Sequence, residues 1–323
     1  MSREIIFLRI VSSMVISFLI CLFLTKKMIK KSKNKQVERK YLDTHLIKNG
    51  TTSGGGKAFF VATIVSFFLM GFGLPFGYKI MALIFATSVF FLIGLLDDES
   101  KVKFNSYKGL SAKIRVILEF IVVIYLIVIL KNTPIDLKSI RVPIFDININ
   151  IAPIYLLFLA IVMIGTSNSV NLTDGLDGLA SGLVMICVAP FILLAILNKE
   201  YVIAIYLSSL IGALMAFLYY NFHPAKIFMG DCGSLYLGSV MGCISIILRN
   251  EVVLFISGFI FVFEAISVII QVISYKLTKK RVFLMTPIHH HFEMKGINEV
   301  SVVMGFYLVG IFLSIFSIIV EVI

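Results

Sequence analysis

Long apolar runs alternate with short polar segments along the whole chain. An α-helix needs about 20 mainly apolar residues to cross the hydrocarbon core of a bilayer. Applying that length predicts ten transmembrane helices, near residues 5–24, 58–74, 79–96, 112–130, 151–166, 179–197, 201–219, 234–249, 252–275 and 300–322. The first run has no small-residue cleavage site after it, so we interpret it as a retained span and not as a signal peptide.

The composition excludes a soluble domain. Of the 323 residues, 59% are hydrophobic and 15% are charged, which is too little charge to cover the surface of a globular protein of this size. The four cysteines have no metal-site spacing and indicate no disulfide framework. We therefore expect an all-α polytopic membrane protein in which residues 1–323 form one integral-membrane domain.

The basic residues are distributed unevenly. The net charge is +11, and the densest basic run follows the first span: Lys26, Lys27, Lys30, Lys31, Lys33, Lys35, Arg39, Lys40, Lys48 and Lys57. Because lysine and arginine collect in cytoplasmic loops, this excess indicates membrane topology and not nucleic-acid binding. The first loop is then cytoplasmic, and with an even number of spans both termini are external. We expect Lys35 and His290 on the cytoplasmic side and Lys138 outside.

Clusters rich in Asp, Asn, His and Gly all fall in connections that this topology places in the cytoplasm. They occupy residues 46–56, 95–101, 167–182, 221–234 and 286–296. The outward connection near 130–151 contains a polar stretch with short alternating runs, which suggests a small hairpin. One cytoplasmic working face is therefore expected.

Asp97 and Asp98 follow an apolar run at the predicted end of the third span. An acidic pair at a helix end is often a simple interfacial flank. Successive residues on a helix point about 100° apart, so the two carboxylates cannot address one atom. The chemical interpretation is a division of roles, in which one carboxylate meets a reacting phosphate and the other meets a cation or a lysine.

Asn168, Asn171, Asp174 and Asp177 recur at every third position. That period favours one helical face, and the glycine at 175 would let a ligand or another backbone approach closely. The simpler interpretation is a helix N-cap with an acidic first turn, but it accounts for one acid only. Acidic groups near the hydrocarbon are costly and are functional candidates by default.

Two further polar segments suggest phosphate chemistry. Asp231 precedes the eighth predicted span, where it is either a capping residue or a ligand for magnesium, which proteins usually hold by one or two carboxylates together with substrate phosphates. His289, His290 and His291 follow Pro287 in a loop outside the predicted spans. Imidazolium groups donate hydrogen bonds to phosphoryl oxygens, although a histidine tract also binds metal adventitiously.

The segments NLTDGLDGLASG, NFHPAKIFMGDCGSLYLG and TPIHHHFEMKG, in this order after LLDD, resemble the phospho-N-acetylmuramoyl-pentapeptide transferase family. The similarity extends from about Lys48 to Gly296. The wider polyprenyl-phosphate sugar-1-phosphate transferase superfamily shares the acidic pair and the DGxDG element, whereas the HHHFExKG element marks this branch. The resemblance implies ten spans, external termini, a homodimer, Mg²⁺, and a place in the bacterial inner membrane with a cytoplasmic active site.

The resemblance also implies residue roles. Asp97 becomes the candidate base or phosphate-facing acid, with Asp98 beside it, and Asp231 becomes the magnesium ligand. The proposed substrate-binding set comprises Lys48, Lys113, Asn168, Asn171, Asp174, Gly175, Leu176, Asp177, Asn221 and Phe228. Of these, Asn168 and Asn171 are expected near the diphosphate and Lys113 near phosphate. Around the uridine the resemblance places Gly175, Leu176, Asp177, Asn221 and Phe228, together with Lys48. His289, His290 and His291 are expected at the sugar-phosphate end.

This sequence departs from the family pattern at several positions. Residues 50–56 read GTTSGGG where the family usually reads GTPTMGG, Cys232 replaces the usual Thr, and Thr286 replaces the usual Ala. None of these changes removes a carboxylate or a histidine. Since the 50–56 loop is expected near the nucleotide, nucleotide affinity is the property they put in question.

The implied reaction transfers phospho-N-acetylmuramoyl-pentapeptide from UDP to undecaprenyl phosphate and releases UMP. One alternative keeps the chemistry but uses a UDP-N-acetylhexosamine that lacks the peptide. A secondary transporter is a remote alternative, because its acids should lie near mid-span in repeated halves, and no repeat is present. A non-catalytic scaffold is disfavoured because all candidate carboxylates are intact.

Overall fold

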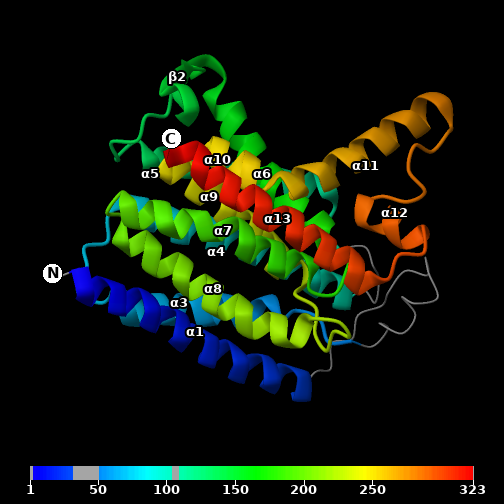
Figure 1. Cartoon of the computed structure of the whole chain (residues 1–323), viewed down its shortest axis with the longest axis horizontal. Helices are drawn as coiled ribbons and strands as arrows, with labels where there is room; N and C mark the ends of the chain where they lie inside the picture. Colours follow the sequence, from blue (N-terminus) through cyan, green and yellow to red (C-terminus); the bar gives the residue numbers. More distant parts are fainter. Residues whose placement is uncertain (1–2, 32–50, 104–108, 323) are drawn as a thin grey trace.

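The computed structural model describes residues 3–31, 51–103 and 109–322, and within them it is almost entirely helical (Figure 1). The helices are α1 (Arg3–Lys31), α3 (Gly56–Gly71), α4 (Tyr78–Lys103), α5 (Ala112–Leu130), α6 (Tyr155–Thr173), α7 (Leu179–Leu197), α8 (Tyr201–Asn221), α9 (Gly230–Leu248), α10 (Glu251–Ser257), α11 (Phe259–Thr278), α12 (Ile288–Met294) and α13 (Glu299–Val322). The all-α membrane fold predicted from the sequence is confirmed.

Each predicted span overlaps a helix, with one division. The run near 252–275 is split at Gly258 into α10 and α11. In the described residues eight helices are long and apolar enough to cross a membrane. Helix α3 has 16 residues, and α5 carries Lys113, Arg115 and Glu119 within its first two turns. The count of ten spans therefore stays a prediction.

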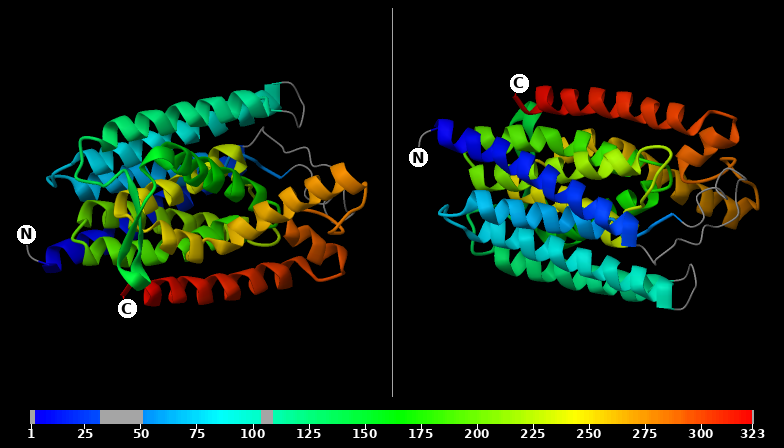
Figure 2. Two further views of the ribbon diagram at one scale, coloured as in Figure 1. Left: turned by 90° about the horizontal axis from the view of Figure 1, so that it is seen from above. Right: turned by 90° about the horizontal axis from the view of Figure 1, so that it is seen from below.

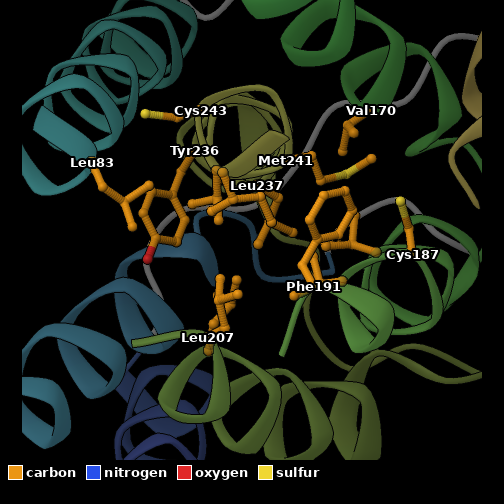
Figure 3. Packing of buried hydrophobic residues seen from close by; sticks show 14 of the residues in the cluster. Leu83, Val170, Cys187, Phe191, Leu207, Tyr236, Leu237, Met241 and Cys243 are labelled. Carbon is orange, nitrogen blue, oxygen red and sulfur yellow. The ribbon is translucent and has the colours of Figure 1, made fainter. Parts of the chain in front are cut away.

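Helix α9 is the centre of the bundle and is almost entirely buried. Its side chains Tyr236, Leu237 and Met241 project toward the surrounding helices (Figure 3). Small residues allow close approach: a Cβ on Gly238 would lie 2.5 Å from the Cα of Ser167 on α6. Between apolar helices such close packing replaces the hydrophobic driving force that lipid does not provide.

The long helices lie side by side, and the chain termini lie at the same end of the molecule (Figures 1 and 2). Helix α12 lies at the opposite end, beside the projecting end of α11. The C-terminal end of α1, with Lys26, Lys27, Lys30 and Lys31, points toward this opposite end. These four lysines and the histidine helix thus lie toward the same end of the molecule, as the predicted topology requires.

A hairpin joins α5 to α6, as the alternating pattern suggested. Strands β1 (Ser139–Val142) and β2 (Ile147–Asn150) pair antiparallel, and η1 (Pro143–Phe145) and η2 (Ala152–Ile154) flank β2. Arg249 donates hydrogen bonds to Ser139 at 2.9 Å and to Asn148 at 3.1 Å, which fastens the hairpin to α9. The hydroxyl of Ser139 also donates to Asp136, and this bond is the main reason that the pKa of Asp136 is lowered.

Candidate active site

The acidic pair lies inside α4 and not at its end. The helix continues through the polar residues after Asp98 and ends at Lys103. Asp97 is buried, with 2% of its surface exposed, and the two carboxylates have separate partners. The expected division of roles is present. Asp97 meets a lysine, as suggested, but Asp98 meets backbone N–H groups and not a phosphate or a cation.

Asp98 caps another helix. Its carboxylate accepts the backbone N–H groups of Asp231 at 2.9 Å and of Cys232 at 3.0 Å, at the start of α9. Helix N-termini have unpaired N–H groups and a partial positive charge, so a carboxylate is a favourable partner. Gly230 is needed here, because its φ is +74° and a Cβ would lie 2.7 Å from Oδ2 of Asp98.

Asp97 meets a lysine and a backbone amide. Its Oδ2 lies 2.7 Å from Nζ of Lys101, one helical turn further along α4, and its Oδ1 accepts the N–H of Leu110 at 2.7 Å. A Cβ on Gly109 would lie 2.4 Å from this carboxylate, so the 109–110 backbone covers it closely. Asp97 is therefore held on two sides.

Lys101 joins the acidic pair to α9. Its ammonium lies 2.8 Å from Oδ1 of Asp231 as well as 2.7 Å from Asp97. Arg115 on α5 approaches the other oxygen of Asp231 at 3.4 Å. Three helices thus bring two acids and two bases to one point, which we call the carboxylate cluster (Asp97, Lys101, Arg115 and Asp231).

The carboxylate cluster fits a hard cation. One oxygen of Asp97 and one of Asp231 converge on the position of the Lys101 ammonium. A site of one or two carboxylates, completed by substrate phosphates, is what Mg²⁺ uses. Asp231 is in the first turn of α9, whose positive end faces it, and its side chain is only 16% exposed.

The two predicted asparagines lie in the last turns of α6 and point to different neighbours. Asn168 donates to Glu119 at 3.0 Å and accepts from Arg115 at 2.9 Å, so it is joined to the carboxylate cluster. Asn171 donates to the hydroxyl of Ser234 on α9 at 2.8 Å. Both therefore fix α6 against the helices that carry the charged groups.

The prediction that Asn168, Asn171, Asp174 and Asp177 share one helical face is wrong for the last of them. Helix α6 ends at Thr173, with Asp174 as its C-cap, and Asp177 lies in the turn before α7. The break occurs because the glycines that follow Asp174 favour a turn, and the second of them, Gly178, has a φ of +79°. The period of three thus crosses a helix boundary.

Asp177 belongs to a second polar group. Its Oδ2 accepts the N–H of Ala225 at 2.9 Å and lies 3.1 Å from Nδ1 of His223. Its own N–H donates to Glu299 at the start of α13, at 2.8 Å. Asp177, His223 and Glu299 offer ligand atoms within 4.8 Å of one another, an arrangement that could hold a metal ion. Asp231, the predicted metal ligand, is not among these three.

The other predicted substrate-binding residues are spread over several segments. Leu176 is buried, and Asn221 donates to the carbonyl of Ile227 and accepts from Ser181, which fixes the loop after α8. Phe228 in that loop donates its N–H to the carbonyl of Thr52. Lys113 is exposed in the first turn of α5. Lys48 lies outside the described residues.

The histidines form a short helix, α12, and not a loop. His289 is completely buried and its Nδ1 lies 3.1 Å from Glu264 on α11. Nδ1 of His290 lies 2.7 Å from Glu293, and Nδ1 of His291 accepts the N–H of Leu284 at 3.1 Å. Each ring is therefore held by a different partner, as three adjacent rings require.

Sequence reasoning missed several charged residues of these groups: Lys101, Arg115, Glu119, His223, Glu264, Glu293 and Glu299. Lys101 carried a signal, since it lies four residues after Asp97 and faces the same side of a helix. Arg115, Glu119 and Glu264 are charges inside apolar runs, which is itself an indication of function. His223 and Glu299 are joined to the site only by the tertiary fold.

Comparisons with known proteins show which part of the chain a family shares. The family described as glycosyl transferase family 4 matches residues 80–249. This stretch contains both carboxylates on α4, the two asparagines on α6 and Asp231. The match therefore covers the carboxylate cluster and ends before the histidine helix.

Individual relatives cover more of the chain, and their names agree. A phospho-N-acetylmuramoyl-pentapeptide-transferase of Bacillus cytotoxicus is 40% identical over 276 residues, 85% of each chain. The protein of that name from Staphylococcus epidermidis is 37% identical over 311 residues, 95% of this chain and 96% of the relative. The one from Wolbachia pipientis is 39% identical over 316 residues, again 95% and 96%.

Proposed function

The chain belongs to the phospho-N-acetylmuramoyl-pentapeptide-transferase family, and we propose that it transfers phospho-N-acetylmuramoyl-pentapeptide from its UDP-linked form to undecaprenyl phosphate. The products are UMP and a lipid-linked precursor of peptidoglycan. Identities of 37% to 40% over most of the chain support this substrate. The muramoyl-pentapeptide branch is also supported by the HHHFEMKG segment, which α12 and the residues after it contain.

The observation that carries the proposal is the carboxylate cluster. Asp97 and Asp231 are 134 positions apart in the sequence, yet both lie within 2.8 Å of the Lys101 ammonium. Phosphoryl transfer demands little covalent work from a protein and depends on positioning and charge neutralisation. The two carboxylates and two cationic groups of the carboxylate cluster provide groups for the positioning and for the charge neutralisation.

In the proposed reaction an oxygen of the lipid phosphate attacks the sugar-proximal phosphorus of the UDP-sugar. A P–O bond forms to the lipid phosphate, and the bond from this phosphorus to the bridging oxygen breaks, so that UMP leaves with that oxygen. Asp97 either takes the proton of the lipid phosphate or holds its oxygen in line. Lys101 and Arg115 lie where they could neutralise charge on the transferred group.

Asp98 has a different proposed role. Because its carboxylate accepts two N–H groups of α9, it acts by placing Asp231 and not by contacting substrate. Asp231 would hold Mg²⁺. When bound, the ion would polarise the diphosphate and reduce its charge. Asn168 and Asn171 would hold α6 against α5 and α9, near the diphosphate.

We propose that the turn containing Asp174, Gly175, Leu176 and Asp177 forms the nucleotide end of the site. Asn221 and Phe228 would contribute through the loop that Asp177 contacts, and Lys48 and Lys113 through their charges. His290 and His291 would lie at the sugar-phosphate end. His289, expected with them, is covered on all sides, so its part is supporting.

The cellular setting is part of the same proposal. The chain would lie in the bacterial inner membrane with its active site facing the cytoplasm, where UDP-linked substrates are available. The end of α1 with its four lysines, on the side of α12, supports this orientation. The homodimer remains a prediction from the resemblance. Measuring the mass of the protein in lipid nanodiscs would give its oligomeric state.

The testing experiment measures UMP release. Purified protein is incubated with undecaprenyl phosphate, Mg²⁺ and either UDP-N-acetylmuramoyl-pentapeptide or UDP-N-acetylglucosamine. Release with the first nucleotide and not with the second supports the proposal. UMP release with UDP-N-acetylglucosamine alone would assign the chain to the simpler hexosamine reaction. Absence of UMP release with both nucleotides would contradict the transferase function.

A further inference from the structure

A buried contact between a carboxyl group and an imidazole joins α11 to the histidine helix. Glu264 and His289 each have 0% of their surface exposed, and Nδ1 of His289 lies 3.1 Å from Oε2 of Glu264. In the described part of the chain no hydrogen bond reaches either carboxylate oxygen of Glu264 or either ring nitrogen of His289. The two side chains are therefore each other's electrostatic partner.

Burying polar side chains costs free energy unless they have partners. Removing one member of this buried pair leaves the other polar group without its partner, which is more damaging than losing a surface contact. Because the contact is made at Nδ1, Glu264 fixes the position of the His289 ring from that edge.

The opposite edge of the ring packs on the proposed nucleotide turn. A Cβ on Gly175 would lie 2.3 Å from Nε2 of His289 and 3.3 Å from Nε2 of His290. Only glycine leaves room for the imidazole at this distance. At the other end of the same turn, Asp177 is held by Ala225 and Glu299. The turn is therefore fixed from two directions, by the Asp177 contacts and by the buried pair.

We propose that Glu264 is a positioning residue for nucleotide binding. It holds His289 by Nδ1, so that the ring supports the backbone of Gly175 and keeps the 174–177 turn in place. This inference rests on the proposed function, which assigns that turn to the nucleotide. It extends the site to α11, which carries none of the site residues predicted from the sequence.

The test compares Glu264→Gln and Glu264→Ala, with UMP as the probe. Glu264→Gln keeps a polar oxygen beside Nδ1 and should weaken UMP binding by about threefold or less, whereas Glu264→Ala leaves the buried ring without this partner and should weaken binding by about tenfold or more. The matched control is Glu251→Gln, which removes another buried carboxylate, on α10. UMP affinity in this control should equal that of the wild type.

The kinetics separate positioning from general loss of fold. A displaced turn raises KM for the UDP-sugar and leaves kcat at saturating nucleotide near the wild-type value. General destabilisation lowers the number of active molecules, and hence the apparent kcat, but leaves the affinity of the survivors unchanged. Partial recovery in Glu264→Gln relative to Glu264→Ala is expected only from positioning.

A double-mutant cycle tests the contact with the turn. Gly175→Ala should weaken UMP binding strongly in the wild-type background, because its methyl group would overlap the His289 ring. In a His289→Ala background that overlap is absent, so the added effect of Gly175→Ala should largely vanish. Additive effects of the two substitutions would overturn the inference.

The outcomes distinguish this inference from the proposed function. If the wild type is active and both Glu264→Ala and Glu264→Gln bind UMP normally, the role of Glu264 is overturned and the transferase function stands. Failure of the wild type to bind UMP would overturn both. Equal loss in both Glu264 variants and in Glu251→Gln would show that burial of any carboxylate matters, and would also overturn the inference.

Discussion

The carboxylate of Asp98 on α4 accepts the backbone N–H of Asp231 on α9 at 2.9 Å, and its second oxygen accepts the N–H of Cys232 at 3.0 Å. One member of an acidic pair therefore caps the helix that carries the proposed magnesium ligand, while the other member faces Lys101. Two neighbouring carboxylates thus serve one centre in different ways, one through the backbone and one directly.

Asp98→Ala should reduce stability and turnover together. The variant loses a helix cap, which typically costs about 1 kcal/mol, and it also frees the first turn of α9 so that Asp231 moves. Asp98→Asn retains one acceptor and should be milder in both respects. Thermal unfolding in detergent and UMP release are the measurements. A normal melting temperature together with abolished turnover in Asp98→Asn would instead indicate direct chemistry.

Asp231→Asn should abolish turnover mainly through loss of metal binding, because an amide keeps the size of the side chain but not its charge. Raising the Mg²⁺ concentration should recover part of the residual activity. Asp97→Asn should show no such recovery, since its proposed role is with the lipid phosphate. The measurement is UMP release across a Mg²⁺ titration, and equal responses of the two variants would contradict the division of roles.

Lys101→Met should increase the affinity for a divalent cation while lowering turnover. The ammonium lies 2.8 Å from Oδ1 of Asp231, so a cation must compete with it for the oxygens of this proposed ligand. Removing an ion pair worth about 1 kcal/mol predicts roughly fivefold tighter binding. Mn²⁺ binding followed by electron paramagnetic resonance gives the affinity directly. Weaker Mn²⁺ binding in this variant would contradict the assignment of Asp231 as the metal ligand.

The three histidines should differ in their effect on folding. His289→Ala leaves the buried Glu264 without its partner, which should cost roughly 1–3 kcal/mol of stability, and it also leaves a cavity in place of the ring. The burial of His289 in a helix, where the sequence predicted a loop outside the spans, is the reason for this loss. His291→Ala removes only an acceptor for the N–H of Leu284, at about 1 kcal/mol. Unfolding measurements on both variants provide the check.

Turnover of the accessible histidine variants tests the substrate. His290→Ala or His291→Ala should lower kcat sharply, because a donor aimed at phosphoryl charge stabilises the transition state more than the ground state. The two effects should be unequal, since adjacent rings point in different directions. Near-normal rates for both with the muramoyl-pentapeptide nucleotide would remove the histidines from the argument for this substrate.

Labelling from the two sides of sealed vesicles tests the topology. The native cysteines Cys21, Cys187, Cys232 and Cys243 are all buried, so an added cysteine should dominate the signal. A membrane-impermeant maleimide should reach Lys138→Cys only from outside and Lys295→Cys only from the cytoplasmic side. Labelling of both positions from the same side would contradict the shared cytoplasmic face.

The sequence by itself determined the class of the fold and the identity of most of the chemical groups. Apolar runs long enough to cross a bilayer must form helices, because backbone groups in lipid can be satisfied only internally. Acids and histidines beside such runs are costly, so their presence marked Asp97, Asp231 and the histidine segment without any structure. These inferences depend on local composition, which the chain shows directly.

Only the tertiary structure decided which groups meet. That Asp98 caps α9, that Lys101 lies between two acids, and that Glu264 holds His289 all depend on contacts between different helices. In a bundle such contacts are determined by how helices pack and rotate against one another, and an apolar run in lipid has no periodic polar face that reveals its rotation. Residues such as Glu264 therefore stand out by their charge in the sequence, but their partners follow only from the packing of the helices.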